Sequence, residues 1–245
     1  MDRKFIFFII IGFLISCKQS PESTKLETSV EEGKSVVVSN AGLASAHPVA
    51  TRIGHDILRN GGNAVDAAIA TQFALAVCYP VAGNIGGGGF MVIRMSDGET
   101  AALDYREKAP GAASRDMYLD AEGNVIDRLS IDGHLAAGVP GSVDGMVKAF
   151  EKYSKLKDWA VLIQPSIDAA RNGFPITARQ AENFNGTMER WQKMNTSANA
   201  FTSTMEWNEG DLLVQEDLAR TLEAIRDKGE DGFYKGWVAD SLVAE

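Results

Sequence analysis

One segment of this chain, residues 64–77 (AVDAAIATQFALAV), is apolar on nearly every side and constrains the fold more than any other segment. Asn63 directly before it is a good helix N-cap, Asp66 stands at the third helical position, and Pro80 prevents the helix from continuing. A helix of this composition is buried on most of its faces, which places it inside a layered core. We therefore expect Cys78, at its end, to be a buried and inert thiol.

The segments around this helix predict further helices and also β-strands. Apolar residues at four-residue spacing predict a helix over 49–57, and the β-branched run at 35–39 predicts a first strand. Two further strands, 90–95 and 100–105, flank an Asp-Gly pair, which is a strong hairpin signal. Beyond them the sequence predicts helices over residues 142–153, 158–171 and 216–228. Together these elements predict a mixed α/β (α+β) layered fold.

The N-terminal residues have the pattern of an export signal. Residues 2–4 are charged, residues 5–15 form an apolar run, and Ser16-Cys17 follows. The run is shorter than the roughly 20 residues that span a bilayer, so it predicts a secretory signal peptide and not a transmembrane helix. Residues 14–17 (LISC) resemble a bacterial lipobox, in which Cys17 becomes the lipidated first residue of the mature chain. An ordinary signal peptide that ends near a chance cysteine is the alternative.

These patterns divide the chain into three parts. We expect residues 1–16 to be a signal peptide, residues 17–33 to be a lipidated cysteine with a flexible polar tether, and residues 34–245 to be the folded body. The protein is then exported to the periplasm or cell envelope and anchored by lipid at Cys17. Its 24 Lys and Arg against 33 Asp and Glu leave a formal net charge of −9. Nucleic acid and anionic lipid surfaces both require a basic footprint, so neither is an expected partner, and membrane contact is expected only through the anchor.

The sequence offers little support for a metal or a cofactor. The histidines His47, His55 and His134 have no ligand-like spacing, so no metal site is expected, and His47 and His134 are expected to be structural. The glycine run at 83–90 fits neither G-x-G-x-x-G nor a phosphate-binding loop, and no nucleotide cofactor is expected.

Two features remain as candidates for a functional site. Gly86, Gly87, Gly88 and Gly89 let another backbone or a ligand approach closely at the start of a strand, but such a run is equally suited to a turn or to packing. Arg106 follows the second strand of the hairpin, where a rigid element presents its charge. It is either a solvated residue in a surface ion pair or a planar, bidentate grip on a carboxylate.

Three segments in a fixed order carry a resemblance to a known family: residues 61–68 (GGNAVDAA), 83–91 (GNIGGGGFM) and 104–110 (DYREKAP). They resemble the large-subunit core of the γ-glutamyltransferases, also called γ-glutamyltranspeptidases or glutathione hydrolases. Shorter matches occur at residues 46–48 with 57–58, 138–142, 164–165 with 169–174, and 233–236. The resemblance runs from about residue 35 to the end and is to the N-terminal part of the large subunit.

The resemblance implies the fold and chemistry of an N-terminal-nucleophile hydrolase. The implied fold is an αββα sandwich, with two central sheets between helical layers, which is incomplete in this chain. The implied precursor cleaves itself into a large and a small subunit, and the Thr freed at the start of the small subunit is the nucleophile. It attacks the γ-carbonyl of glutathione or of γ-glutamyl peptides, and water or an amino-acid or peptide acceptor then takes the γ-glutamyl group. The small subunit is thus the implied protein partner.

The resemblance also implies one site residue. In the family, the Arg of the D-[FY]-R-E segment holds the α-carboxylate of the γ-glutamyl group, and this role carries over to Arg106. Gly86 to Gly89 are expected to pack beside the site. The family's nucleophile lies beyond the position of Glu245, so we expect no catalytic residue in this chain and no activity from the 245 residues alone. Two alternatives remain, an inactive lipid-anchored γ-glutamyl-binding remnant and a cephalosporin or glutaryl acylase of the same fold.

Overall fold

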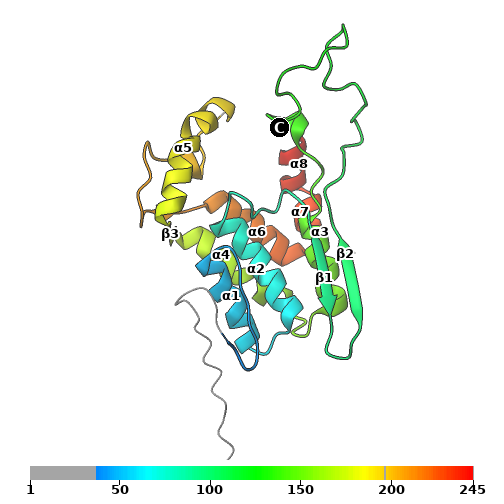
Figure 1. Ribbon diagram of the computed structural model, residues 1–245, viewed down its shortest axis with the longest axis vertical. Coiled ribbons are helices and arrows are strands. Elements are labelled where there is room, and N and C mark those ends of the chain that lie inside the picture. Colours follow the sequence, from blue (N-terminus) through cyan, green and yellow to red (C-terminus); the bar gives the residue numbers. More distant parts are fainter. Residues whose placement is uncertain (1–36, 196, 245) are drawn as a thin grey trace, which may run out of the picture. The chain divides into compact units, whose positions relative to one another are not determined.

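The computed structural model describes residues 37–195 and 197–244 (Figure 1). The expected signal peptide, the lipidation site Cys17 and the tether lie outside these residues. From Asn40 onward the chain forms one compact unit that contains both helices and strands, which confirms the mixed α/β class. Among the described residues, no helix is both long and apolar enough to cross a membrane.

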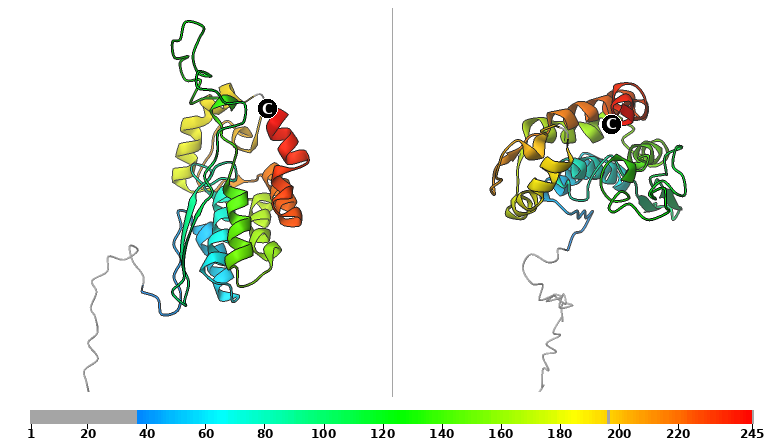
Figure 2. Two further views of the ribbon diagram at one scale, coloured as in Figure 1. Left: turned by 90° about the vertical axis from the view of Figure 1, so that its right-hand side faces the viewer. Right: turned by 90° about the horizontal axis from the view of Figure 1, so that it is seen from above.

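Helix α2 (Ala64–Cys78) lies at the centre of this unit, as its composition predicts. Most of its residues are buried. It packs against α1 (Pro48–Arg59), α3 (Ser142–Tyr153) and α4 (Trp159–Asn172), which cover it on several sides (Figure 2). The expected N-cap is present as a reciprocal capping box, in which the side chains of Asn63 and Asp66 each accept a hydrogen bond from the other residue's backbone N–H.

The side chain of Asp66 also ties α2 to the connection between α3 and α4. This carboxylate is completely buried and accepts hydrogen bonds from the Ser154 hydroxyl and from the backbone N–H groups of Lys155 (3.1 Å) and Leu156 (3.3 Å). A buried carboxylate is costly unless hydrogen bonds replace its hydration, and here both oxygens are engaged. Asp66 therefore joins two parts of the chain that are about 90 residues apart in sequence.

Two buried glutamines hold the other end of α2. The Gln180 side chain donates to the carbonyl oxygen of Cys78 at 2.8 Å, and the Gln215 side chain donates to that of Val77 at 2.8 Å. The last carbonyl groups of a helix lack partners within the helix, so these bonds satisfy groups that would otherwise be orphaned.

The predicted hairpin consists of β1 (Phe90–Arg94) and β2 (Thr100–Asp104), paired antiparallel with Phe90 opposite Asp104. Gly98 in the connection has a φ of +94°, a conformation that glycine adopts without strain. Successive side chains point to opposite faces, so Ile93 is buried while Val92 is exposed. The hairpin lies beside α3 and contacts it through β2 (Figure 1).

The C-terminal helices join this core through α6, which packs on α4 (Figure 2). Helix α6 (Glu216–Lys228) lies against α4, and the indole N–H of Trp159 donates to the Ile225 carbonyl oxygen at 2.9 Å. Helix α7 (Asp231–Tyr234) follows after Gly229 and folds back onto α6. The other described elements are α5 (Ala178–Met194), α8 (Trp237–Ala244), the paired strands β3 (Phe174–Pro175) and β4 (Leu212–Leu213), and 3-10 turns at His134–Ala136 and Ala200–Thr202.

The predicted helices over 49–57, 142–153, 158–171 and 216–228 all form, within one or two residues of their expected ends. The strand expected over 35–39 is wrong for Val37–Ser39, the part of it that the structure describes. Val37 and Val38 are exposed there and pair with no other described strand. β-branched residues favour a strand only where a neighbouring strand offers hydrogen bonds and burial.

Candidate functional site

The glycine run and the segment after β2 lie side by side. The Tyr105 N–H donates to the Gly89 carbonyl oxygen at 3.0 Å, and the Gly89 N–H donates to the Tyr105 carbonyl oxygen at 3.3 Å. These two bonds extend the antiparallel ladder by one pair beyond the hairpin. Arg106 is the next residue, so its side chain projects from a stretch of backbone that this pairing holds rigid.

Close approach to the segment after β2 requires the absence of a side chain at two of the four glycines, Gly88 and Gly89. A Cβ would stand 2.5 Å from the nearest atom at Gly88 and 2.8 Å from the buried Tyr105 ring at Gly89. At Gly87 the nearest atom, at 2.7 Å, is the end of the exposed Asn84 side chain, which can move aside. At Gly88 the obstructing atom is the backbone nitrogen of Glu107. The glycine run and residues 105–108, which we call the arginine segment, therefore touch through their backbones. The expected packing role does not extend to Gly86, where a Cβ would meet open space because no neighbouring atom comes within 4 Å.

A third segment, just before α3, completes the arrangement. Lys108 and Val139 form a β-bridge with backbone hydrogen bonds of 3.1 and 2.7 Å. The Gly141 N–H donates to the Gly87 carbonyl oxygen at 2.8 Å. Gly141 also lies so close to Tyr105 that a Cβ would stand 2.1 Å from the tyrosine's carbonyl oxygen. Three segments that are distant in sequence, and that all belong to the resemblance, therefore converge on the arginine.

The Arg106 side chain extends away from this backbone cluster toward solvent and is 64% exposed. Its backbone N–H donates to the Asp104 carboxylate at 3.0 Å, and its guanidinium carbon lies 5.9 Å from the centre of the Phe90 ring. The Glu107 carboxylate forms a surface ion pair with the guanidinium at 4.0 Å, a distance that is too long for a hydrogen bond. The guanidinium thus has a fixed base, an aromatic neighbour and free donors for a carboxylate ligand.

Arg106 borders a pocket of about 250 Å³. The other charged residues that line this pocket are Lys108, Asp144 and Glu230. The Asp144 carboxylate forms an ion pair with Lys148 at 2.6 Å. Glu230 and Tyr234, which also lines the pocket, come from the chain around α7, and nothing in the sequence pattern places them near Arg106.

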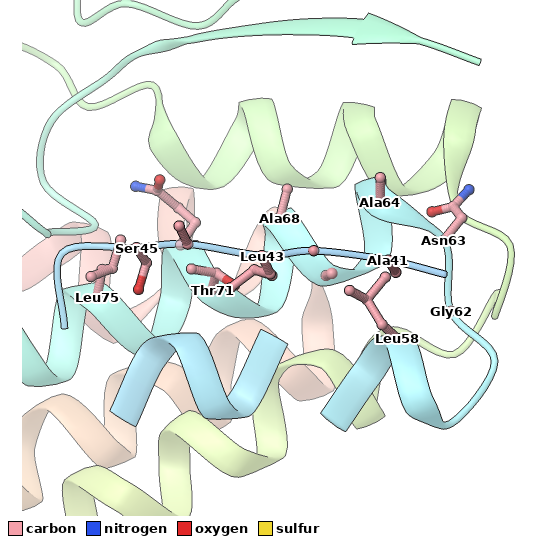
Figure 3. A pocket seen from close by; sticks show the side chains of 14 residues that line it. Ala41, Leu43, Ser45, Leu58, Gly62, Asn63, Ala64, Ala68, Thr71 and Leu75 are labelled. Atoms are coloured by element: carbon pink, nitrogen blue, oxygen red, sulfur yellow. The ribbon is translucent and has the colours of Figure 1, made fainter. Parts of the chain in front are cut away.

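A larger cavity of about 780 Å³ lies elsewhere, between residues 41–45, α1 and α2 (Figure 3). Leu43, Leu58, Thr71 and Leu75 point into it from three segments. In the part of the chain that the structure describes, no ionisable side chain lines this cavity. It therefore supplies no acid, base or counter-ion. We take the pocket at Arg106 as the candidate site because it is lined by the arginine that the sequence singles out.

The histidines expected to be structural lie in different surroundings. His47 is buried; its Nδ1 accepts from the Val49 N–H at 3.3 Å, and its Nε2 lies 3.1 Å from Gln180 Oε1. Burial lowers the pKa of His47 below 6.5 more than the bond to Gln180 raises it. His134 is exposed in the turn His134–Ala136. Over residues 37–195 and 197–244, no three His, Cys, Asp or Glu side chains gather as metal ligands would.

Cys78 is buried and unbridged, as expected. Burial raises the pKa of its thiol to about 12. A thiol with such a pKa stays protonated at neutral pH and is a poor nucleophile.

Comparisons of the sequence and of the fold with known proteins point to the same family. Residues 50–245 match the family model described as gamma-glutamyltranspeptidase. The chain is 48% identical over 211 residues to a glutathione hydrolase proenzyme of Pseudomonas sp. (strain A14), which covers 85% of this chain and 36% of the relative. The solved structure of Helicobacter pylori gamma-glutamyltranspeptidase is similar at 49% identity and a TM-score of 0.81, covering 85% of this chain and 60% of that one. A cephalosporin acylase from Bacillus halodurans is similar at 25% identity and a TM-score of 0.69, covering 80% and 37%.

The chain spans less than half the length of the curated relatives it matches. Within that span, the family match includes the glycine run, the arginine segment and the turn before α3. Because the match extends over most of the chain and the sequence identity to relatives is high, the chain belongs to the gamma-glutamyltranspeptidase family.

Proposed function

We propose that this chain is the N-terminal part of an enzyme that hydrolyses or transfers the γ-glutamyl group of glutathione and other γ-glutamyl compounds. Family membership supports the reaction class. The observation that carries the proposal is the position of Arg106, whose backbone is held by pairing on both sides while its guanidinium stays mostly exposed beside a pocket. An arginine presented in this way is suited to binding a ligand carboxylate.

Arg106 would hold the α-carboxylate of the γ-glutamyl group, several bonds away from the amide that is cleaved. Binding at that distance does not take part in bond breaking but orients the γ-carbonyl toward the nucleophile. A rigid backbone matters for this role, because a small displacement of the bound carboxylate would move the reacting carbonyl as well. The contacts of Gly88, Gly89 and Gly141 with the arginine segment favour such rigidity.

The nucleophile in this proposal is a Thr that becomes N-terminal when the precursor cleaves itself, in a small subunit outside the present sequence. Its hydroxyl oxygen bonds to the γ-carbonyl carbon, and its own α-amine takes the hydroxyl proton. The amide C–N bond breaks, the leaving amine departs with that proton, and a γ-glutamyl ester remains. Water or the amine of an acceptor then attacks the ester and frees the Thr. The residues described here would supply substrate binding.

The test is the substitution Arg106→Ala in the complete gene product. We expect KM for a γ-glutamyl anilide to rise roughly 30-fold or more, as expected for a lost charge-assisted bidentate contact worth about 2 kcal/mol. A 4-aminobutyryl anilide, which lacks the α-carboxylate, is the matched control, and kcat/KM for it should stay within about twofold of wild type. Unchanged kinetics with the γ-glutamyl substrate would contradict the proposal. Binding of γ-glutamyl peptide by the wild-type protein without any turnover would instead support the inactive remnant.

The likeness to a cephalosporin acylase keeps a second reaction under consideration. A glutaryl group retains the carboxylate of the γ-glutamyl group and lacks only its α-amine, so Arg106 could hold either substrate. The higher identity to the transpeptidase favours the γ-glutamyl reaction. Comparison of kcat/KM for γ-glutamyl and glutaryl anilides decides between them, and a preference for the glutaryl substrate would favour the acylase.

We also propose export and lipid anchoring at Cys17, on the basis of the charged start, the apolar run and the polar tether in the sequence. The substitution Cys17→Ser should move the mature protein from the membrane fraction to the soluble fraction of the envelope and abolish labelling by radioactive palmitate. Equal membrane association of the two proteins would favour an ordinary signal peptide and some other form of attachment.

A further inference from the structure

Helix α3 begins beside Arg106 without a capping side chain of its own. Its N-cap is Gly141, which has no side chain, so it cannot accept a hydrogen bond from the first turn of the helix. Ser, Thr, Asp or Asn would cap better, but each brings a Cβ, which would stand 2.1 Å from the Tyr105 carbonyl oxygen. Close packing against the arginine segment thus requires a glycine at position 141, whereas capping of α3 would require a polar side chain there.

Tyr234, from α7, supplies the missing cap. Its hydroxyl oxygen accepts a hydrogen bond from the backbone N–H of Asp144, in the first turn of α3, at 3.3 Å. The same hydroxyl donates to the carbonyl oxygen of Pro140 at 2.7 Å. Burial is the main cause that raises the pKa of Tyr234 above 10, so the hydroxyl keeps the proton that this second bond needs.

The turn that Tyr234 holds also packs against the backbone of the arginine segment. Val139 pairs with Lys108 on one side of Pro140, and on its other side Gly141 lies against the carbonyl oxygens of Tyr105 and Arg106. A shift of this turn would remove the backbone neighbours of Arg106 on that side. The tyrosine hydroxyl therefore acts on Arg106 only through the backbone of this turn. Neither of its two hydrogen bonds involves the guanidinium.

We propose that Tyr234 is a positioning residue, which holds the Pro140–Gly141 turn so that Arg106 presents its guanidinium to the α-carboxylate of the substrate. This inference rests on the proposed function of Arg106. It assigns α7 to the substrate-binding site, although α7 lies more than 90 residues along the chain from the turn that it holds.

The test is a double-mutant cycle in the complete gene product, with Tyr234→Phe, Arg106→Ala and the double variant. Tyr234→Phe removes only the hydroxyl and keeps the ring, which packs edge-to-face on Phe233 at 5.0 Å between centroids. We expect KM for the γ-glutamyl anilide to rise about three- to tenfold, the range for one lost hydrogen bond, with kcat within twofold. In the Arg106→Ala background the same substitution should change KM by less than about 1.5-fold, because the group it positions is gone.

The matched control is Tyr118→Phe, which also removes a tyrosine hydroxyl bonded to a backbone carbonyl, that of Leu135 at 2.8 Å. It should leave KM unchanged. Equal effects of Tyr234→Phe in the two backgrounds, or a loss confined to kcat, would show a merely structural role and overturn the inference. If Tyr234→Phe behaves as wild type while Arg106→Ala raises KM, this inference fails and the proposed function stands. If Arg106→Ala itself has no effect, the proposed function fails and the inference fails with it.

Discussion

Gly145, in the first turns of α3, lies directly against the ring of Tyr105, so that a Cβ built on Gly145 would stand 2.2 Å from Cγ of the tyrosine. Tyr105 is buried and immediately precedes Arg106. The helix surface at Gly145 is thus the support on which the arginine segment rests, and the contact explains why a glycine is found inside a helix at this position.

Gly145→Ala should destabilise the protein, because the added methyl group forces Tyr105 to move. We expect a loss of about 1–3 kcal/mol in the free energy of unfolding, together with a raised KM for γ-glutamyl substrate. Gly186→Ala in α5 is the matched control, since a Cβ there meets open space and alanine is the better helix former by about 0.5–1 kcal/mol. Denaturant unfolding of the two variants measures the difference, and equal stability would contradict the contact.

Arg106→Lys should recover little of the binding lost in Arg106→Ala. Lysine keeps the positive charge but replaces a planar fork of donors with a single ammonium group. We expect KM for the γ-glutamyl anilide to stay within about threefold of the alanine variant, as expected if bidentate geometry carries most of the contact. A KM near that of the wild type would mean that charge alone is sufficient and that the carboxylate is not held in a fixed orientation.

Asp66→Asn should destabilise the protein strongly even though the two side chains have nearly the same size. The amide presents an NH₂ group where the carboxylate accepts from N–H and O–H donors, so at least one buried donor loses its partner. The expected loss is about 2–4 kcal/mol in the free energy of unfolding. Glu189→Gln, on the exposed face of α5, is the control and should change stability by less than about 0.5 kcal/mol. A similar, small effect in both variants would show that the Asp66 contacts contribute little.

His47 should make stability depend on pH. Burial lowers its pKa in the folded state, so between that lowered value and the unfolded value of 6.5 the unfolded chain binds more protons. The free energy of unfolding therefore falls as the pH falls through this window, and His47 adds no pH dependence above it. The variant His47→Asn should show a flatter profile from pH 7 to pH 5, whereas His55→Asn, at an exposed position, should retain the wild-type slope. Identical slopes in all three proteins would contradict the assignment.

Cys78 should resist alkylation in the native protein. Its thiol is buried and its raised pKa, about 12, keeps it protonated. We expect iodoacetamide to modify Cys78 only in denaturant, as measured by mass spectrometry of peptides. Modification at comparable rates in native and unfolded protein would show that α2 opens readily at its C-terminal end.

Features that depend on neighbours in sequence were predictable. The bounds of α1, α2, α3, α4 and α6 follow from apolar periodicity, from the cap at Asn63 and from glycines beyond the helix ends. The hairpin follows from its Asp-Gly turn. Val37 and Val38 show the limit of such patterns, because a strand also needs a partner that local sequence does not identify.

The family, the central helix and the arginine on which the proposed function depends could all be inferred from the order of the amino acids. Only the tertiary structure showed that Asp66 ties α2 to the α3–α4 connection, that Gly145 supports Tyr105, and that Tyr234 caps α3. The reason is physical. Periodicity and capping act over a few residues, and so they leave a pattern in the chain. A buried carboxylate, a missing Cβ or a distant hydroxyl acts on groups up to 94 residues away, and its partner is defined only once the core has packed.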